Sequence, residues 1–405
     1  MAQAHAMGLD PSRYLDCSAT TPLAPQVQQA MQGCQRHAWA NPSSLHGFGL
    51  QAAEQLERQR QRLAELLGCQ SGRVVFTSGG TEAIHLALLG MANQHSPDSR
   101  LLISSVEHPA TLAAAEQLKR AGWQVQQLPV DHQGLVDLDQ LQRLLVPPTR
   151  LVSLIWGQNE VGTLQPMERI GALCRQAGVP LHVDAVQVVG HRPIAFDNLP
   201  VDLLSLAAHK LQGPRGIGAL LIRQGMELRP LLGGGGQEGG LRAGTEPVDL
   251  VTGLVAALEL SQRRLQSHGD RDPIAPLRDA LLQRLVALPG LSLTGTDPRV
   301  HGAETRLPHH ISLLVRSHQG MPLAGRQLVQ ELWGEGWAIS SGAACSSGRQ
   351  QPSPVLMAMG YGTDEAQAGV RISLGAWHGE ALLEHLPAAL GRAMARCSVS
   401  RGASV

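Results

Sequence analysis

Helical stretches alternate with short apolar segments from about residue 50 to residue 222, and this alternation constrains the fold more than any other feature of the chain. The apolar segments are rich in Val, Leu and Ile. Strands that alternate with helices in this way predict an α/β protein, with a mostly parallel sheet covered by helices on both faces. We expect seven strands, at residues 73–77, 101–105, 123–130, 151–156, 181–185, 201–208 and 218–222.

The alternation ends at the glycine-rich segment "LGGGGQEGGLRAGTEP" (232–247), which predicts a long loop. A helix is expected at about 248–266, and the sequence after it has fewer parallel-strand patterns. A chain of 405 residues is also too long for one simple core. We therefore expect a large domain at 14–264 and a smaller α+β domain formed by 1–13 and 265–405.

Charge and apolar patterning argue against two classes of protein. The 33 Lys and Arg residues balance the 33 Asp and Glu residues, and the absence of a basic block argues against direct nucleic-acid binding. The first residues lack a basic start and a continuous apolar core, and no later apolar run reaches the roughly 20 residues that span a bilayer. We expect a cytoplasmic protein without a membrane segment.

The six cysteines lie far apart and show neither the paired spacing of a metal site nor the density of a disulfide framework. We expect reduced thiols and no metal. Cys34, Cys69, Cys174 and Cys397 are most simply small apolar residues, and Cys17 is interpreted as structural. Cys345 differs, because it lies in "SSGAACSSG" (340–348), a stretch without charge or large apolar side chains.

Three motifs place polar residues directly after predicted strands, where ligands of parallel sheets gather. In "TSGGTEA" (77–83), a helix N-terminus and Thr81 could bind an anion or form an ordinary cap. In "LHVDAVQ" (181–187), Asp184 could pair with a protonated ring nitrogen or cap the next turn. In "SLAAHKLQGPRGIG", Lys210 could form a Schiff base or be a surface group. Together they are what pyridoxal 5'-phosphate requires.

With these motifs the chain resembles the cysteine desulfurases of the class V aminotransferase family, which are pyridoxal-phosphate enzymes of fold type I. "SSGAACSSG" resembles the longer, mobile cysteine loop of the NifS/IscS type, here about 338–352, and differs from the short "RTGHHC" loop of the SufS type. The resemblance covers roughly residues 14–378 and rests on "YLDCSATTP", "NPSSLHGFG", "SGGTEA", "SSVEHPA", "QNEVG", "HVDAVQ", "AHKLQGPRG", "RAGTEP", "SSGAACSSG" and "VRISLGAW".

The resemblance implies a role for each matching residue. Lys210 would be the Schiff-base lysine, His108 would lie over the cofactor ring and assist proton transfer, and Cys345 would receive the sulfur. Further residues would bind the cofactor, the substrate or both: Gly80, Thr81 and His209 at the phosphate, Asp184 at the pyridine nitrogen, Gln187 at the phenolic oxygen, Asn159 at cofactor and substrate, Thr245 from a second subunit, Arg371 at the substrate carboxylate and Asn41 beside it.

Several of these residues also have ordinary structural interpretations, and two positions depart from the family pattern. Without the resemblance, His108 would be a surface or cap residue, Asn159 a turn residue and Arg371 a solvated or ion-paired residue. Ala207 stands where the family usually has a hydroxyl that contacts the phosphate, so one donor is missing. Gly239 stands where the family usually has an arginine. This difference puts in doubt whether the loop of the neighbouring subunit contributes to the site.

The resemblance implies a homodimer that converts L-cysteine to L-alanine. Sulfur would pass to Cys345 as a persulfide and then to an acceptor protein of unknown identity, for iron–sulfur cluster assembly or for tRNA or cofactor thiolation. Three alternatives remain: a selenocysteine lyase, another class V lyase or aminotransferase, and a low-activity binding subunit of a sulfur relay. A lyase without a sulfur carrier would not need Cys345, so the cysteine loop argues against it.

Overall fold

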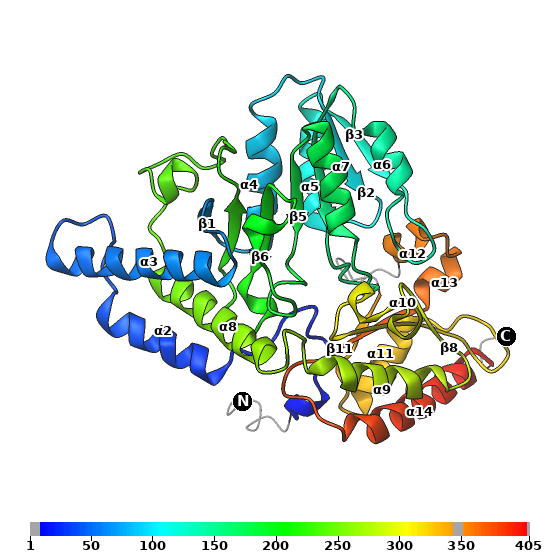
Figure 1. The fold of residues 1–405 in the computed structure, drawn as a ribbon. Helices are drawn as coiled ribbons and strands as arrows, with labels where there is room; N and C mark the ends of the chain where they lie inside the picture. Colours follow the sequence, from blue (N-terminus) through cyan, green and yellow to red (C-terminus); the bar gives the residue numbers. More distant parts are fainter. Residues whose placement is uncertain (1–8, 343–350, 403–405) are drawn as a thin grey trace.

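The computed structural model describes residues 9–342 and 351–402, and it contains two sheets (Figure 1). The larger sheet has seven strands in the order β1-β7-β6-β5-β4-β2-β3. Its strands are β1 (Arg73–Thr77), β2 (Arg100–Ser104), β3 (Gln124–Leu128), β4 (Thr149–Ile155), β5 (Leu181–Asp184), β6 (Leu203–Ala207) and β7 (Gly218–Ile222). Each overlaps a strand predicted from the sequence, so the seven predicted strands are confirmed.

One strand of this sheet runs against the others. β7 is antiparallel to both β1 and β6, whereas β6, β5, β4, β2 and β3 pair in parallel. Since β1 and β6 are each opposed to β7, β1 has the direction of the parallel strands. The predicted mostly parallel sheet is therefore confirmed, and six carboxyl ends meet at one edge.

Helices cover both faces of the sheet, because successive strand residues point to opposite sides. In β7, Ala219 and Leu221 join one core, and Leu220 and Ile222 join the other. The second core contains α4 (Gly80–Ala92) and α5 (Pro109–Arg120). The helices of the first core are α2 (Pro25–His37), α3 (Gly47–Leu66), α6 (Leu138–Leu144), α7 (Met167–Ala177) and α8 (Val248–Gln266).

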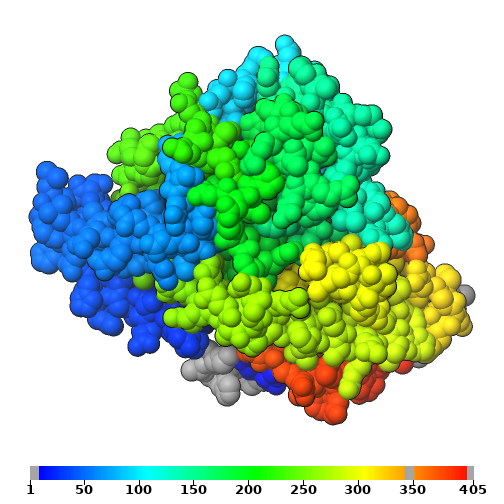
Figure 2. Space-filling view, viewed as in Figure 1, coloured from blue at the N-terminus to red at the C-terminus, as the bar shows by residue number. Residues whose placement is uncertain are grey.

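The smaller sheet is antiparallel, with strand order β10-β11-β9-β8 and a separate core. Its strands are β8 (Leu291–Leu293), β9 (His310–Val315), β10 (Ser340–Ser341) and β11 (Gly369–Ser373). Its helices are α9 (Ile274–Val286), α10 (Pro298–His301), α11 (Gly325–Gly334), α12 (Pro354–Ala358), α13 (Thr363–Gln367) and α14 (Leu382–Gly402). In Figure 2 this yellow-to-red part lies directly against the green and cyan part. The domain limits expected from the sequence remain a prediction.

An N-terminal segment, residues 14–21, connects the two parts and lies beside the carboxyl edge of the large sheet. Leu15 packs in the smaller core, and Asp16 forms a bridge with Ser373 of β11. A few residues later, the backbone N–H of Thr21 donates to the carbonyl oxygen of His209 at 2.9 Å. The segment thus passes from the smaller core to the turn that carries Lys210.

No helix within residues 9–342 and 351–402 has the length and apolar character needed to cross a membrane. The start of α3 projects from the body of the molecule, on the side opposite to α14 (Figure 1).

Candidate active site

A cavity of about 270 Å³ lies at the carboxyl edge of the large sheet. The strands deliver their final residues to this edge, and the turns that follow them form the walls. The residues that line the cavity are Ser18, Gly80, Thr81, Ile84, His108, Ile155, Asn159, Asp184, Val186, Gln187, Ala207, His209 and Lys210. Residues that are far apart in the sequence are thus brought together by the topology of one sheet.

The N-terminus of α4 forms one wall of the cavity. Gly79 adopts a φ of 152°, which side chains rarely tolerate, and the helix begins at Gly80. A Cβ atom at Gly80 would lie 2.8 Å from Cγ2 of Val186, so a side chain there would enter space that the cavity wall already fills. The free backbone N–H groups of this first turn and the Thr81 hydroxyl suit an anionic group such as phosphate.

Lys210 lies in a short 3-10 turn directly after β6. Its Nζ donates to the carbonyl oxygen of Ser18 at 2.6 Å and to that of Ala19 at 2.8 Å. Burial, followed by the nearby charge of Arg371, lowers the pKa of Lys210 to about 8. A lysine with this pKa supplies far more neutral amine near neutral pH than an exposed lysine does, which suits a nucleophile or a base.

Asp184 ends β5, and its side chain is buried beside the cavity. Oδ1 accepts a hydrogen bond from the backbone N–H of Val186 at 3.0 Å, so the carboxylate does cap the following turn. Burial raises the pKa of Asp184, while the neighbouring His108 and Lys210 act in the opposite direction. A cationic ring nitrogen placed against this carboxylate would hold it in the charged form.

His108 combines a structural contact with a place in the cavity wall. It is the N-cap of α5, and its Nδ1 accepts from the backbone N–H of Ala110 at 3.1 Å. Since Nδ1 is an acceptor, a neutral ring carries its proton on Nε2. Burial lowers the pKa of His108, which favours this neutral form. The cap interpretation and a role in proton transfer are therefore compatible.

Arg371 lies in β11 and reaches the site from the smaller sheet. Nη1 donates to the backbone carbonyl oxygen of Asn159 at 2.9 Å, and Nη2 donates to Oδ1 of Asp16 at 2.8 Å. Arg371 Nε and Asn159 Oδ1 are buried without a hydrogen-bond partner within the described residues. The N–H groups of the guanidinium can donate to the carboxylate of a small amino acid, and Asn159 Oδ1 can accept a hydrogen bond from a donor group of the ligand.

Eight of the expected site residues line the cavity: Gly80, Thr81, His108, Asn159, Asp184, Gln187, His209 and Lys210. Ala207 lines the cavity with them, and Arg371 adjoins it through its hydrogen bond to Asn159. The side-chain amide of Gln187 donates to the carbonyl oxygen of Ser18 at 2.9 Å. Asn41 and Thr245 are exposed and lie outside the cavity lining. Cys345 lies outside the described residues.

The residues that are present fit pyridoxal phosphate. The N-terminal turn of α4 and Thr81 suit a phosphate, Asp184 suits a protonated ring nitrogen, and Lys210 suits an aldehyde. Among residues 9–342 and 351–402 there is no group of three or more His, Cys, Asp or Glu side chains that could hold a metal ion.

The two departures have different consequences. Ala207 lines the cavity, and its methyl group lies 3.6 Å from the place of a Cβ on Gly80, beside the first turn of α4. A hydroxyl there would face the same anion. Gly239 adopts a φ of 64°, a left-handed conformation that costs an arginine free energy but costs glycine little. The backbone of this loop therefore accounts for glycine at that position.

Sequence reasoning missed the part that residues 16–19 play in the site. Asp16 pairs with Arg371, and the carbonyl oxygens of Ser18 and Ala19 accept from Lys210. The motif "YLDCSATTP" was the available signal, although a backbone carbonyl cannot be recognised from residue type. Cys17, in the same motif, is buried, and burial followed by Asp16 raises the pKa of its thiol.

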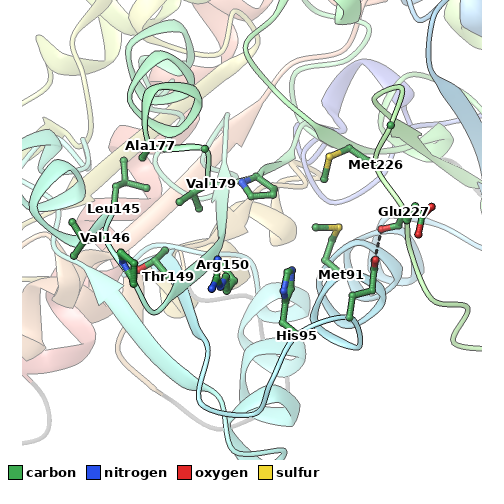
Figure 3. A pocket seen from close by; sticks show the side chains of 15 residues that line it. Met91, His95, Leu145, Val146, Thr149, Arg150, Ala177, Val179, Met226 and Glu227 are labelled. Atoms are coloured by element: carbon green, nitrogen blue, oxygen red, sulfur yellow. Dashed lines mark hydrogen bonds between the residues drawn. The ribbon is translucent and has the colours of Figure 1, made fainter.

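A second hollow, of about 450 Å³, lies at the opposite edge of the large sheet (Figure 3). Thr149 and Arg150 at the start of β4, and Val179 just before β5, line it. Figure 3 shows mainly apolar side chains around Arg150 and His95, including Met91 and Met226. The hollow is larger than the first cavity, but it lies at the amino ends of the parallel strands and lacks convergent groups of the kind found around Lys210.

Comparison with known proteins identifies a family and its fold. A family model described as "Aminotransferase class-V" matches residues 13–386. A "Cysteine desulfurase" from Cereibacter sphaeroides is 39% identical over 381 residues, covering 92% of this chain and 94% of the relative. A "Cysteine desulfurase IscS" from Dictyoglomus turgidum is 37% identical over 364 residues, covering 89% of each. A solved structure described as "NIFS-LIKE PROTEIN" has a TM-score of 0.83 at 32% identity, with 95% of this chain and 99% of that chain covered.

Proposed function

Because the chain belongs to the aminotransferase class-V family and, within it, to the cysteine desulfurases, we propose that it transfers the sulfur of L-cysteine to Cys345 and releases L-alanine. The observation that carries this proposal is the convergence of Lys210, Asp184, His108 and the N-terminus of α4 on one cavity, with Arg371 beside it. These groups match the phosphate, the ring nitrogen and the aldehyde of pyridoxal phosphate, and Arg371 matches the carboxylate of an amino acid.

Bound pyridoxal phosphate would supply an electron sink that makes the Cα proton of an amino acid acidic and its carbon–sulfur bond labile. Thr81, His209 and the first turn of α4 would hold its phosphate, and Asp184 would hold its ring nitrogen in the protonated state. Asn159 and Gln187 would contact its remaining polar groups. Lys210 would bond to its carbonyl carbon.

Lys210 is the residue suited to move the Cα proton. Its lowered pKa, about 8, makes the neutral amine accessible, and the carbonyl oxygens of Ser18 and Ala19 fix where the amine group rests. His108 carries its ring proton on Nε2 when it is neutral, so it can donate one proton and take back another without leaving its cap position. General acid–base groups of this kind typically contribute about 10²–10⁴-fold to a rate.

Arg371 and Asn159 would orient the substrate. In the part of the chain that the structure describes, Arg371 Nε and Asn159 Oδ1 have no hydrogen-bond partner, and Arg371 Nη1 donates to the backbone carbonyl oxygen of Asn159. A substrate carboxylate at Arg371 fixes the position of Cα relative to Lys210. Desolvation of both partners makes this charge-assisted contact stronger than it would be in water.

The sulfur step conserves atoms and electrons. The thiolate of Cys345 attacks the substrate sulfur, an S–S bond forms and the carbon–sulfur bond breaks. The electron pair of the broken bond stays on carbon, which takes protons and leaves as L-alanine. Cys345 is left as a persulfide, which an acceptor protein of iron–sulfur cluster assembly or of thiolation then takes up. The step requires a reactive thiolate at position 345.

A second copy of the chain would complete the site. Thr245 is exposed and lies outside the cavity of its own chain. Trp39, Leu45 and Phe48 are also exposed, at 68%, 91% and 60%, at the projecting start of α3. An exposed aromatic and aliphatic patch of this kind is typical of a protein interface. We include a homodimer in the proposal on these two grounds.

The test is to incubate the holoenzyme with L-cysteine and to quantify alanine and sulfide in the presence of a reducing agent. The proposal predicts equal amounts of both, and it predicts that Cys345→Ala keeps the bound cofactor's absorbance but loses turnover. Wild-type protein that binds the cofactor and forms neither product would contradict the proposal.

A further inference from the structure

Arg371 forms an ion pair with an acidic side chain of the N-terminal segment, Asp16. Asp16 Oδ1 accepts from Arg371 Nη2 at 2.8 Å, and the two side chains are 24% and 5% exposed. This ion pair occupies the guanidinium to which the proposed function assigns the substrate carboxylate. An internal carboxylate and an incoming carboxylate would therefore meet at one arginine.

The hydrogen bonds of Arg371 show at which of its nitrogens the substrate carboxylate and the Asp16 carboxylate would meet. A guanidinium binds a carboxylate through two parallel N–H groups, either from Nε and Nη2 or from Nη1 and Nη2. Nη2 belongs to both edges, and Asp16 holds it. Nη1 already donates to the carbonyl oxygen of Asn159, whereas Nε is buried and has no hydrogen-bond partner in the described part of the chain. The edge left for a substrate is that of Nε and Nη2, next to Asp16.

A second carboxylate at Nη2 would be repelled by the carboxylate of Asp16, because both carry a negative charge and would lie close together. The positive charge of Lys210 acts on Arg371 from the cavity side. Glu160 also lies near Arg371, and burial raises the pKa of Glu160 to about 7. The substrate carboxylate can gain the full interaction with Arg371 only when Asp16 moves away or shares Nη2.

We propose that Asp16 is a specificity-determining residue that competes with the α-carboxylate of substrate and product for Arg371. The inference rests on the proposed function, which places that carboxylate at Arg371. Competition weakens the binding of L-alanine as well as that of L-cysteine, so it favours release of the product. It leaves the binding of amines without a carboxylate unchanged.

The backbone around Asp16 indicates that its side chain can be changed without loss of the fold. The main chain of Asp16 accepts from the backbone N–H groups of Ala19 and Thr20 and from the hydroxyl of Tyr14, and it bridges Ser373. None of these contacts uses the carboxylate. Asp16→Asn keeps the shape and an acceptor for Nη2 while it removes the charge. Asp16→Ser is a second variant, with a shorter side chain.

The experiment compares the holoenzyme of the wild type, Asp16→Asn and Asp16→Ser. Asp297→Asn is the matched control, because Asp297 forms an ion pair with Arg299 at 2.7 Å and neither residue lines the cavity. Calorimetry measures the dissociation constants of L-alanine and of ethylamine, which lacks the carboxylate, and steady-state assays measure KM and kcat for L-cysteine. The thermal unfolding midpoint shows that each variant is folded.

We expect both Asp16 variants to bind L-alanine about fivefold more tightly than the wild type, the size typical of one partly exposed charge interaction. KM for L-cysteine falls in parallel, and the affinity for ethylamine stays unchanged. In the control variant Asp297→Asn, all of these constants equal those of the wild type. Unchanged or weaker L-alanine binding in both folded variants would overturn the inference, as would an equal gain for ethylamine. If the wild type forms no alanine from L-cysteine, the proposed function itself fails and the inference fails with it.

Discussion

Lys210 donates through Nζ to the carbonyl oxygen of Ser18 at 2.6 Å. The same carbonyl oxygen accepts from the side-chain amide of Gln187 at 2.9 Å. Two residues expected in the cofactor site, from different turns of the large sheet, thus share one oxygen of the N-terminal segment. The position of Lys210 therefore depends on residues 14–21, which are anchored in the smaller core through Leu15.

The sequence contains only two lysines, Lys119 and Lys210, which makes the cofactor-binding lysine easy to test. Lys210→Ala is expected to lose the visible absorbance of the bound cofactor and to lose activity by about a thousandfold or more. Lys119 is exposed in the last turn of α5, so Lys119→Ala is the control and should retain both properties. Reduction of the holoenzyme with borohydride followed by peptide mapping should place the cofactor on Lys210. Labelling of Lys119 instead would refute the assignment.

Cofactor uptake should depend on pH through Lys210. Burial and Arg371 lower the pKa of this amine to about 8, so the neutral form becomes the major form above pH 8 rather than above the ordinary value of about 10.4. The rate at which cofactor-free protein regains its visible absorbance with pyridoxal phosphate should rise between pH 7 and 9 and then level off. A rate that continues to rise through pH 10 would show that Lys210 has an ordinary pKa.

Ala207→Ser should restore a phosphate contact. The side chain of Ala207 lines the cavity beside Gly80, and a hydroxyl there adds one hydrogen bond to an anion, worth about 1–2 kcal/mol. We expect the dissociation constant of pyridoxal phosphate to fall by roughly tenfold, as measured by equilibrium dialysis. Ala121→Ser, on the exposed end of α5, controls for the substitution itself. Equal affinities in all three proteins would argue that the phosphate lies elsewhere.

Gly239→Arg should not reproduce the arginine that related proteins have at this position. A φ of 64° is costly for a side chain, so we expect the free energy of unfolding to fall by about 1 kcal/mol. Gly233 lies in the same loop, has open space at its Cβ position and does not share the positive φ, so Gly233→Arg is the matched control. Urea denaturation of both variants measures the difference. A Gly239→Arg protein as stable as the control would contradict the strain argument.

Local patterns predicted the sheet and the cavity residues Thr81, Asp184 and Lys210, whereas the cavity residues His108, Asn159, Gln187 and His209 were expected only from the family resemblance. Apolar strands followed by polar residues placed Asp184 and Lys210 at one edge, and the structure has them there. The pairing of Asp16 with Arg371 joins residues 355 positions apart, and no local pattern reports such a contact. The sequence did not predict that Asn41 and Thr245 lie outside the cavity lining of their own chain. Their expected roles involve the substrate and a second subunit, and local sequence patterns do not report such contacts.

The capping contact of His108 shows a second limit of sequence reasoning. From the sequence, His108 could be interpreted as a helix cap or as a residue of the site. In the structure it is both, because its Nδ1 accepts from the backbone N–H of Ala110 and its ring lines the cavity. Asp184 likewise caps a turn and lines the cavity. Side chains with two polar atoms can satisfy two structural requirements at once, and only coordinates show which atom serves which requirement.

The most direct test of the account is mass spectrometry of the Cys345 peptide after the holoenzyme has reacted with L-cysteine, with alanine measured in the same sample. The account predicts one added sulfur on Cys345, formed together with alanine and removed by a thiol reductant. Alanine formation with an unmodified Cys345 peptide, and undiminished turnover in Cys345→Ala, would contradict it.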